Sequence, residues 1–243
     1  MKKEILTLST NRKIAKDVFE ATFTGDLSAI ERPGQFVNLT ISGCYLRRPL
    51  SVCDAEGDVL TLVYKVVGKG TEILSRAEKG EKFDTLIGLG NGFDVNKSGE
   101  YPLLIGGGVG VPPLYLLCRR LTEKGCKPTV ILGFNQKEEV FYEEKFRALG
   151  AKTIVTTADG SYGVKGYATD AMQGLSYTFF YTCGPMPMFR AVEKVAVGSG
   201  EYSFEERMGC GFGACMGCSC KTKYGSKRIC KDGPVLEREE IVW

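Results

Sequence analysis

The sequence predicts an α+β protein in three parts: an antiparallel β-barrel, a doubly wound parallel α/β sheet and a small C-terminal module. Three observations predict this order. Short β-branched and aromatic runs separated by Gly, Pro or Asp occupy residues 1–98, strands and helices alternate over residues 99–200, and five cysteines crowd into residues 201–243. At 243 residues the chain is long enough for two ordinary domains and an appendage.

The first part has the pattern of short strands that is typical of an antiparallel barrel or sandwich. Strands are predicted at Ile5–Ser9, Val18–Thr24, Gln35–Ile41, Val59–Tyr64 and Lys82–Leu86. A further strand is expected to begin at Arg48. A helix over Thr71–Ala77 is expected to interrupt the strands and to end at Lys79-Gly80.

The second part alternates buried strands with helices. Strands are predicted at Leu103–Ile105, Thr129–Phe134, Lys152–Thr157 and Thr178–Thr182. Helices are predicted at Pro112–Thr122, Glu138–Leu149, Ala168–Met172 and Pro185–Val197. Prolines in the first turn of the first helix cost little, because the N–H groups there have no partner within the helix. This order of elements predicts a parallel, doubly wound sheet.

Composition excludes several classes of function. The net charge of +3 includes no long basic or acidic block, so neither nucleic acid nor an anionic membrane is an implied partner. No run approaches the roughly 20 apolar residues of a membrane span. The absence of histidine excludes histidine-ligated metal centres and histidine acid–base catalysis, so any reaction must rely on cofactors. Ten cysteines without an export signal predict a cytoplasmic protein.

Four cysteines have the spacing of a metal cluster. Cys210, Cys215 and Cys218 form C-x4-C-x2-C, and Cys230 follows at a distance, which is the plant-type pattern for a 2Fe–2S cluster. A structural zinc site usually shows two short C-x2-C pairs, and a redox pair of Cys215 and Cys218 leaves two cysteines unexplained. A disulfide framework is disfavoured in a chain of this length. Cys220 is either a spare thiol or a rival ligand.

Two segments of the barrel have features of a phosphate site. In Arg48-Pro49-Leu50-Ser51 an arginine stands three residues before a hydroxyl on an extended segment, where it can offer a guanidinium fork to a pyrophosphate. An ordinary surface arginine is the alternative. Gly68-Lys69-Gly70-Thr71 adds weight, because glycine-exposed N–H groups at a helix start bind anions. Together the two segments could hold one dinucleotide.

Two loops of the sheet point to a second dinucleotide. Gly106-Gly107-Gly108-Val109-Gly110 follows a buried strand and precedes a helix, as in dinucleotide-binding folds, although Val111 stands where G-x-G-x-x-G has its last glycine. A tight strand-to-helix turn is the alternative. Cys183-Gly184-Pro185-Met186 follows the last predicted strand, at the sheet edge where ligands bind. Cys183 either faces a substrate ring, at a nicotinamide site, or is a small buried hydrophobe.

The segment after the second parallel strand favours NAD over NADP. It reads Phe134-Asn135-Gln136-Lys137-Glu138-Glu139, with no arginine for a 2′-phosphate and with two carboxylates that would repel one. The expected acidic partner for the ribose is missing, and Asn135 is the residue nearest to that place.

Taken in order, these motifs resemble the ferredoxin reductase superfamily. With the cysteine segment behind them, the whole chain resembles the electron-transfer subunits of dihydroorotate dehydrogenase B. The resemblance implies an FAD barrel over 1–98, an NAD-binding domain over 99–200 and a 2Fe–2S module over 201–243. It also implies that FAD contacts Arg48, Pro49, Leu50, Ser51, Val63, Tyr64, Lys65, Gly70 and Thr71. The NAD site would then comprise Gly106, Gly107, Gly108, Gly110, Cys183, Gly184 and Pro185.

The resemblance also implies a reaction and a partner. Electrons from dihydroorotate oxidation in an FMN-containing catalytic subunit would pass through the cluster to FAD and then to NAD+, in pyrimidine biosynthesis, in a complex with two copies of each chain. Hydride transfer between flavin and nicotinamide needs no protein acid or base, which suits a chain without histidine. Phe212 and Met216, two apolar residues on the cysteine loop, are expected to form the docking patch.

Two other functions compete with this one. The first is an NAD(P)H–ferredoxin reductase or a sulfide dehydrogenase-type subunit of the same superfamily. Relatives of that type often have an aspartate cluster ligand, whereas all four positions here are cysteine. The second is a non-catalytic zinc-binding regulator, which would be colourless when purified.

Overall fold

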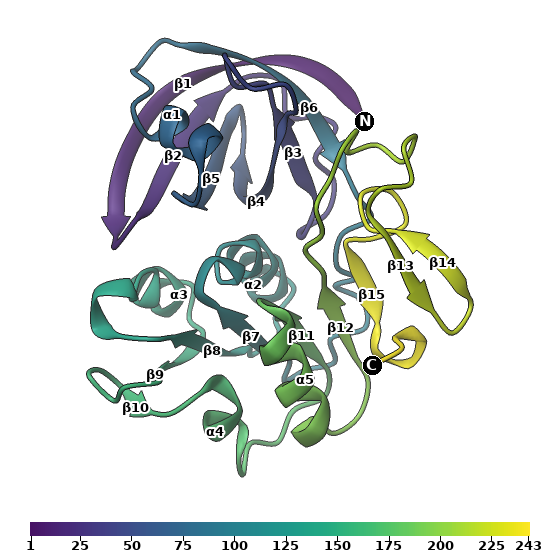
Figure 1. The fold of residues 1–243 in the computed structure, drawn as a ribbon. Coiled ribbons are helices and arrows are strands. Elements are labelled where there is room, and N and C mark those ends of the chain that lie inside the picture. Colours follow the sequence, from purple (N-terminus) through teal and green to yellow (C-terminus); the bar gives the residue numbers. More distant parts are fainter.

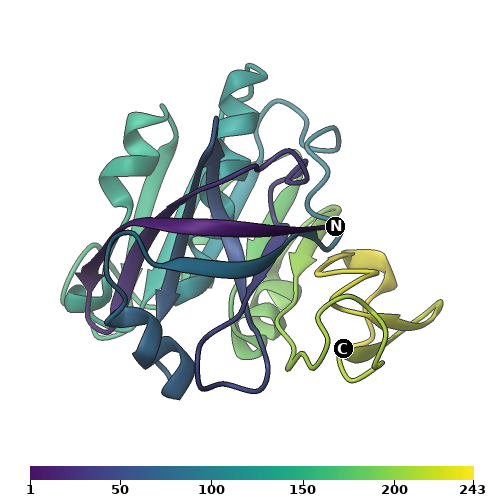
Figure 2. The ribbon, with the colours of Figure 1, turned by 90° about the horizontal axis from the view of Figure 1, so that it is seen from above.

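Three parts make up the computed structural model, which describes residues 1–243. A barrel lies above a sheet flanked by helices, and the C-terminal module lies at the side of both (Figures 1 and 2). None of the helices is both long enough and apolar enough to cross a membrane.

The barrel is closed by six antiparallel strands in the order β1-β2-β5-β4-β3-β6. Their bounds are β1 Lys2–Ala15, β2 Val18–Thr24, β3 Phe36–Leu39, β4 Arg48–Glu56, β5 Val59–Lys65 and β6 Lys82–Leu89. Alternate side chains point into the barrel, so that Phe83 and Ile87 of β6 are buried in its core between more exposed neighbours. The predicted antiparallel barrel and the strand predicted to begin at Arg48 are confirmed.

The barrel helix α1 spans Lys69–Ser75, so it begins and ends two residues earlier than predicted. The Thr71 hydroxyl accepts hydrogen bonds from the backbone N–H groups of Val67 and Gly68, at 3.0 and 3.3 Å. Because of these bonds the helix begins before Thr71. Leu74, one turn further on, packs into the barrel core.

The second part is a seven-stranded sheet in the order β10-β9-β8-β7-β11-β12-β15. Its strands are β7 Leu103–Gly107, β8 Thr129–Phe134, β9 Lys152–Thr157, β10 Val164–Lys165, β11 Phe180–Cys183, β12 Gly200–Ser203 and β15 Val235–Glu237. All neighbours are parallel except β12 and β15. The strand order reverses between β7 and β11, which places their carboxyl ends at the point where such sheets bind ligands.

Helices cover both faces of this sheet, as predicted. Helices α2 (Pro113–Glu123) and α3 (Glu143–Ala148) pack on the face toward the barrel, and α4 (Ala168–Met172) and α5 (Met186–Val195) pack on the other face (Figure 1). A single 3-10 turn, η1 (Gly108–Gly110), separates β7 from α2. The doubly wound α/β fold is therefore confirmed.

One predicted helix is wrong. The segment predicted as Glu138–Leu149 is split into a 3-10 turn, η2 (Lys137–Glu139), and α3. Between them Val140 is extended and Tyr142 is left-handed, with φ of 69°. Phe141 and Tyr142 bury their rings in the core of the sheet, and that packing interrupts the helix.

Several strands of the last part have no counterpart in the prediction. β13 (Ser219–Thr222) and β14 (Gly225–Arg228) form a hairpin, β12 and β15 join the sheet, and a 3-10 turn, η3, spans Arg238–Glu240. These stretches are short and lack regular alternation, so no local pattern marks them. The predicted boundary between residues 200 and 201 falls inside β12.

The two larger parts share a core. Leu116 of α2 belongs to the hydrophobic cluster inside the barrel. Val18, Cys53 and Val63 of the barrel belong in turn to the cluster between the sheet and α2. The barrel is therefore packed directly on the helices of the sheet.

Candidate functional site

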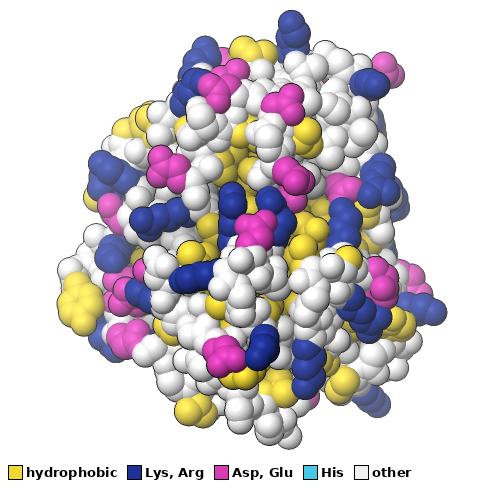
Figure 3. Space-filling view, turned by 180° about the vertical axis from the view of Figure 1, so that it is seen from behind, with side chains coloured by type: hydrophobic (Ala, Val, Ile, Leu, Met, Phe, Trp, Pro, Cys, Tyr) yellow, Lys and Arg dark blue, Asp and Glu magenta, His cyan; other side chains and the backbone are white.

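A cavity of about 690 Å³ lies between the barrel and the carboxyl ends of β7 and β11. Seen from behind, the molecule is hollowed between these parts, with Lys and Arg side chains around apolar ones (Figure 3). The barrel contributes Phe36, Pro49, Ser51 and Lys65 to the wall. The sheet contributes Gly107, Gly108, Gly110, Cys183, Gly184 and Pro185, and the segment leading to the cysteine module contributes Ser203, Phe204, Glu205, Glu206 and Met208.

The glycine loop (Gly106–Gly110) and the Cys183 loop (Cys183–Met186) are in direct contact at this point. A Cβ at Gly110 would overlap the carbonyl oxygen of Cys183. Glycine is therefore required for the two loops to close against each other, apart from any contact with a ligand. Gly106, by contrast, lies in β7 behind the loop, next to Val111, and is not part of the wall.

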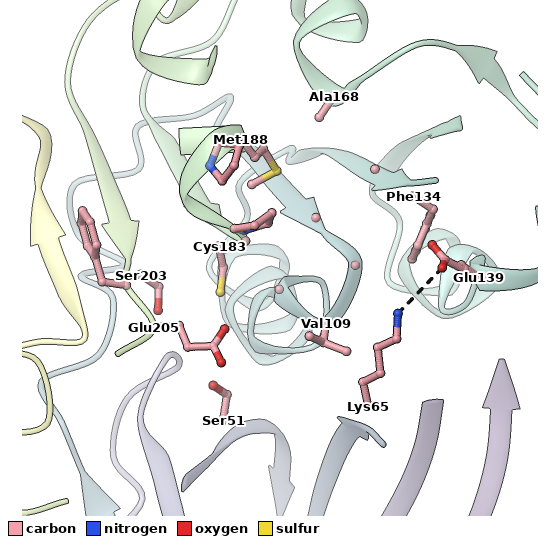
Figure 4. A pocket seen from close by; sticks show the side chains of 18 of the residues that line it. Ser51, Lys65, Val109, Phe134, Glu139, Ala168, Cys183, Met188, Ser203 and Glu205 are labelled. Carbon is pink, nitrogen blue, oxygen red and sulfur yellow. Dashed lines mark ion pairs between the residues drawn. The ribbon is translucent and has the colours of Figure 1, made fainter. Parts of the chain in front are cut away.

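Cys183 is both buried and part of the cavity wall. In Figure 4 the Glu205 carboxylate lies between the Cys183 thiol and Ser51. Burial raises the pKa of the Cys183 thiol to about 12; contact with Ser203 opposes the shift and the charge of Glu205 adds to it. The thiol is therefore neutral near pH 7, a small uncharged surface rather than a nucleophile.

At the other end of the cavity, Glu139 stands beside Asn135. Its carboxylate accepts hydrogen bonds from the Asn135 backbone N–H at 3.2 Å and from the Asn135 side-chain amide at 3.0 Å. Lys65 of the barrel forms an ion pair with it at 3.8 Å, across the cavity (Figure 4). A carboxylate is thus present near this strand end, where the sequence predicted none. The η2 turn brings Glu139 back to Asn135 from four residues further along the chain.

Arg48 and Gly70, which are 22 residues apart, meet at the edge of the barrel. The Arg48 guanidinium lies over the backbone of Gly70, where any side chain would overlap it. Arg48 forms no ion pair within the chain, whereas its neighbour Arg47 pairs with Asp84 at 2.7 Å. One arginine is therefore used by the barrel. The other donates from Nη1 to the Leu46 carbonyl and keeps its charge without a carboxylate partner, beside a helix start.

The remaining residues predicted to bind FAD have different surroundings. Val63 and Tyr64 point into the hydrophobic cores, and Leu50 packs against the barrel core. At Val63 and Tyr64 of β5, therefore, only the backbone is left to face a cofactor. The Thr71 hydroxyl is used within its own turn, because it also donates to the Gly68 carbonyl at 3.0 Å. Gly70 and Thr71 can therefore offer backbone N–H groups.

The four predicted cluster cysteines form two neighbouring pairs. The Cys210 sulfur accepts hydrogen bonds from the N–H groups of Ala214 at 3.2 Å and Cys215 at 3.4 Å, and the Cys215 sulfur accepts one from Cys210. The Cys218 sulfur accepts one from the Cys230 N–H at 3.4 Å. No three His, Cys, Asp or Glu side chains converge as the ligands of one ion would. Each pair could supply two thiolates, which is the number that one iron of a 2Fe–2S core takes from the protein.

The thiols of the two pairs differ in their environments. Partial burial raises the pKa of Cys210. Hydrogen bonds from backbone N–H groups, that of Phe212 above all, outweigh this effect and lower the pKa to about 6. Burial raises the pKa of Cys230 to about 12, and the neighbouring Cys218 adds to the shift. Cys215 is exposed while Cys218 and Cys230 are buried. The cysteine site therefore has one face toward the body of the chain and one toward its surface.

Cys220 lies on the hairpin strand β13 and packs partly buried against the hydrophobic cluster that contains Cys218 and Cys230. Burial raises the pKa of its thiol. No hydrogen bond joins it to the four other cysteines of the module.

Two family models match the chain. Residues 205–242 match the iron–sulfur cluster binding domain of dihydroorotate dehydrogenase B, and residues 104–194 match the oxidoreductase NAD-binding domain. Among curated proteins, the dihydroorotate dehydrogenase B (NAD(+)) electron transfer subunit of Bacillus pumilus is 45% identical, covering 99% of this chain and 98% of that protein. The subunit of the same name from Geobacillus is 43% identical over 100% and 99%.

The chain belongs to the dihydroorotate dehydrogenase B electron transfer subunits. It is an oxidoreductase subunit, and its redox groups are FAD, a 2Fe–2S cluster and NAD. The predicted electron-transfer function, with a catalytic dihydroorotate dehydrogenase subunit as partner, is thereby confirmed.

Solved structures agree with this family. The structure of an NADH-dependent reduced ferredoxin–NADP oxidoreductase, described for flavin-based electron bifurcation, is 31% identical with a TM-score of 0.89 and covers 98% of this chain and 90% of that one. The flavohaem-like FAD/NAD binding domain of Vibrio cholerae nitric oxide dioxygenase has a TM-score of 0.69 at 18% identity, covering 79% of this chain and 91% of that one. The second likeness shows the fold alone.

Some wall residues had no sequence signal. Phe36 of β3 and Phe204 after β12 line the cavity and also belong to the buried cluster with Cys218 and Cys230. Glu205 follows Phe204 in a stretch without a recognisable pattern. These residues join the cavity to the cysteine module, and only the tertiary contacts reveal that role.

Proposed function

We propose that this chain takes electrons from dihydroorotate oxidation in its catalytic partner at the cysteine module and delivers them to NAD+ in the cavity. The observation that carries the proposal is the meeting of four segments in one place. One cavity is lined by residues of all four: the Arg48–Ser51 strand, the glycine loop, the Cys183 loop and the segment leading to the cysteine module. The bound groups supply the redox chemistry: a cluster exchanges single electrons, a flavin one or two, and NAD a hydride.

The balance of the reaction needs no further oxidant. Dihydroorotate loses two electrons and two protons, NAD+ gains one hydride, and one proton is released. No side chain has to act as acid or base on the nicotinamide, which agrees with the absence of histidine and with a neutral Cys183. The protein's contribution is to hold the redox groups close together and to exclude water.

Cys210, Cys215, Cys218 and Cys230 are the proposed ligands of the 2Fe–2S cluster. Two pairs of thiols, each with N–H···S hydrogen bonds from the loop backbone, match a core of two irons with two thiolates each. Cys220 is proposed to be a bystander because it lies on β13, outside both pairs.

FAD is proposed to bind along the barrel from Arg48 to Lys65. Arg48 and the backbone of Gly70-Thr71 would hold the pyrophosphate, since this guanidinium has no carboxylate partner of its own. Pro49, Leu50 and Ser51, with the backbone of Val63-Tyr64-Lys65, would hold the flavin toward the cavity.

NAD is proposed to bind across the carboxyl ends of β7 and β11. Gly107, Gly108 and Gly110 would receive its pyrophosphate, with Gly106 supporting the loop from behind, and Cys183, Gly184 and Pro185 would contact the nicotinamide ring. The small neutral thiol of Cys183 leaves room for the ring to lie against the flavin. The division into domains 1–98, 99–200 and 201–243 is part of the same proposal.

The catalytic partner is proposed to contain FMN and to assemble as two copies of each chain, in the cytoplasm. Free cysteines support that compartment, since thiols stay reduced there. The proposed contact surface is the cysteine loop, where Phe212 and Met216 expose 44% and 55% of their surface around the exposed Cys215.

The test uses the protein loaded with FAD and cluster, alone and with its catalytic subunit. Alone it should pass electrons from NADH to an artificial dye and leave dihydroorotate untouched. With the subunit it should couple dihydroorotate oxidation to NAD+ reduction. Rapid dihydroorotate oxidation by the isolated chain would refute the division of labour.

A further inference from the structure

Strand β3 lies between the cavity and the cysteine module and has side chains in contact with both. Val37 and Leu39 point into the barrel core. Phe36 lines the cavity and packs in the cluster that contains Cys218 and Cys230. Asn38 points toward the cysteine loop. Its strand neighbour in β4 is Pro49, within the proposed flavin segment.

Asn38 makes a direct contact with a proposed cluster ligand. Its Nδ2 donates a hydrogen bond to the backbone carbonyl of Cys210, at 3.4 Å, across 172 residues of sequence. Gly211, with φ of 78°, packs so closely on the same amide that any side chain there would overlap it. From its other side the cysteine loop is held by its own module, because Arg228 donates to the Gly213 carbonyl at 3.0 Å.

Barrel stability does not explain an asparagine at this position. The side chain is 1% exposed, and its Oδ1 has no hydrogen-bond partner. A buried oxygen without a partner destabilises the folded state, and an apolar residue of the same size would avoid that cost. The arrangement therefore indicates that the contact with the cysteine loop is what this residue provides.

We propose that Asn38 is a positioning residue for electron exchange between FAD and the cluster. It fixes the Cys210 end of the cysteine loop against β3, the strand that also borders the flavin cavity. The inference rests on the proposed binding of FAD and cluster. With both groups bound, two single-electron transfers from the cluster, together with one proton, would give FAD what it needs to pass one hydride to NAD+. Their rate depends on how firmly the loop is held against β3.

Stopped-flow mixing of the FAD- and cluster-loaded protein with NADH separates the two steps, since flavin and cluster bleach at different wavelengths. Asn38→Leu, which removes the donor without leaving a void, should leave flavin reduction unchanged and slow cluster reduction about fivefold to tenfold. Asn38→Val is smaller and uncharged and also lacks the donor, so it repeats the test if leucine is not accommodated. The iron content and paramagnetic signal of each variant confirm that the cluster is present.

Asn91 is the matched control. It also ties the barrel end to the C-terminal module, donating to the carbonyls of Asp232 at 3.2 Å and Val235 at 2.7 Å and accepting from the Val235 N–H. Asn91→Ala should lower the free energy of unfolding more than Asn38→Leu does, without a selective delay of cluster reduction.

Three outcomes would overturn the inference. They are an equal slowing of cluster reduction in the Asn91 variant, unchanged cluster reduction in both Asn38 variants, and loss of the cluster from both Asn38 variants. Failure of the unaltered protein to reduce a cluster with NADH would refute the proposed function instead.

Discussion

At the scale of single residues, the cysteine module allows the most direct test. Changing Cys210, Cys215, Cys218 or Cys230 to Ser should weaken or abolish the 2Fe–2S absorption and the paramagnetic signal of the reduced state, because a hydroxyl is a poorer iron ligand than a thiolate. Cys220→Ser is the control and should keep both signals. If Cys230→Ser kept the cluster and Cys220→Ser lost it, the fourth ligand would be Cys220 instead of Cys230.

Adjacent arginines provide a matched pair for FAD binding. Arg48→Ala should give a folded protein with little FAD, since each charge-assisted hydrogen bond to a phosphate contributes about 1.5–3 kcal/mol. Arg47→Ala removes the same charge but breaks only the pair with Asp84, so FAD should be retained. The measurement is the FAD-to-protein ratio after purification. Full occupancy in the Arg48 variant would mean that the phosphates are held elsewhere.

Neighbouring glutamates provide a matched pair for the choice of nicotinamide cofactor. Glu139 lines the cavity and pairs with Lys65, whereas Glu138 is exposed. Glu139→Gln should lower the preference for NADH over NADPH about tenfold, because a 2′-phosphate would no longer meet a carboxylate and would find Lys65 free. Glu138→Gln makes the same change in net charge and should leave the preference unaltered. Titration with NAD+ and NADP+ gives the binding ratio independently of turnover; equal effects of the two variants would contradict a specific role for Glu139.

At the scale of elements, the broken helix before α3 holds the sheet against the barrel. Tyr142 donates a hydrogen bond to the buried Glu20 of β2 at 2.5 Å, Lys145 of α3 donates to the same oxygen, and Arg12 of β1 binds the other one. Burial alone would raise the pKa of Glu20, but the hydrogen bonds from Lys145, Tyr142 and Arg12 outweigh it and lower the pKa. The left-handed Tyr142 that interrupts the predicted helix thus joins the sheet to the barrel.

Glu20→Gln should therefore lower the free energy of unfolding by about 2 kcal/mol at pH 7. Because the folded-state pKa lies below the ordinary value of 4.5, the stabilisation is complete above that pH and is lost as the pH falls through the folded-state value. The difference between the two proteins in urea unfolding should shrink as the buffer is taken from pH 7 to below pH 4. A difference that stays constant over this range would exclude Glu20 as its source.

At the scale of the whole molecule, the cysteine site has a buried side toward the cavity and an exposed side toward the proposed partner. Phe212→Ser should weaken binding of the catalytic subunit about tenfold, since apolar side chains at the centre of an interface contribute most of its affinity. Tyr224→Ser, on the turn between β13 and β14, removes an exposed aromatic ring away from that loop and serves as the control. Affinity is measured by titration of one loaded subunit with the other. Unchanged affinity in the Phe212 variant would place the interface elsewhere.

The sequence by itself determined the fold class and the family, because their signals are local. The spacing of Cys210, Cys215, Cys218 and Cys230, the glycine loop after β7 and the alternation of strands and helices all lie within short windows. A metal cage or a tight turn needs particular residues at fixed neighbouring positions, so the chemistry is visible in the sequence. The broken helix at Tyr142 was missed, because helical propensity there is overridden by the burial of two aromatic rings.

The tertiary structure alone decided which distant residues meet. Asn38 reaches Cys210 across 172 residues, Glu139 turns back to Asn135 and faces Lys65 of the barrel, and β15 leaves the cysteine module to join the sheet. No periodicity or spacing encodes such contacts, since they depend on how the barrel, the sheet and the module pack together. The environment of each cofactor site is set by that packing, because burial, charge and distance act between side chains that only the fold brings together.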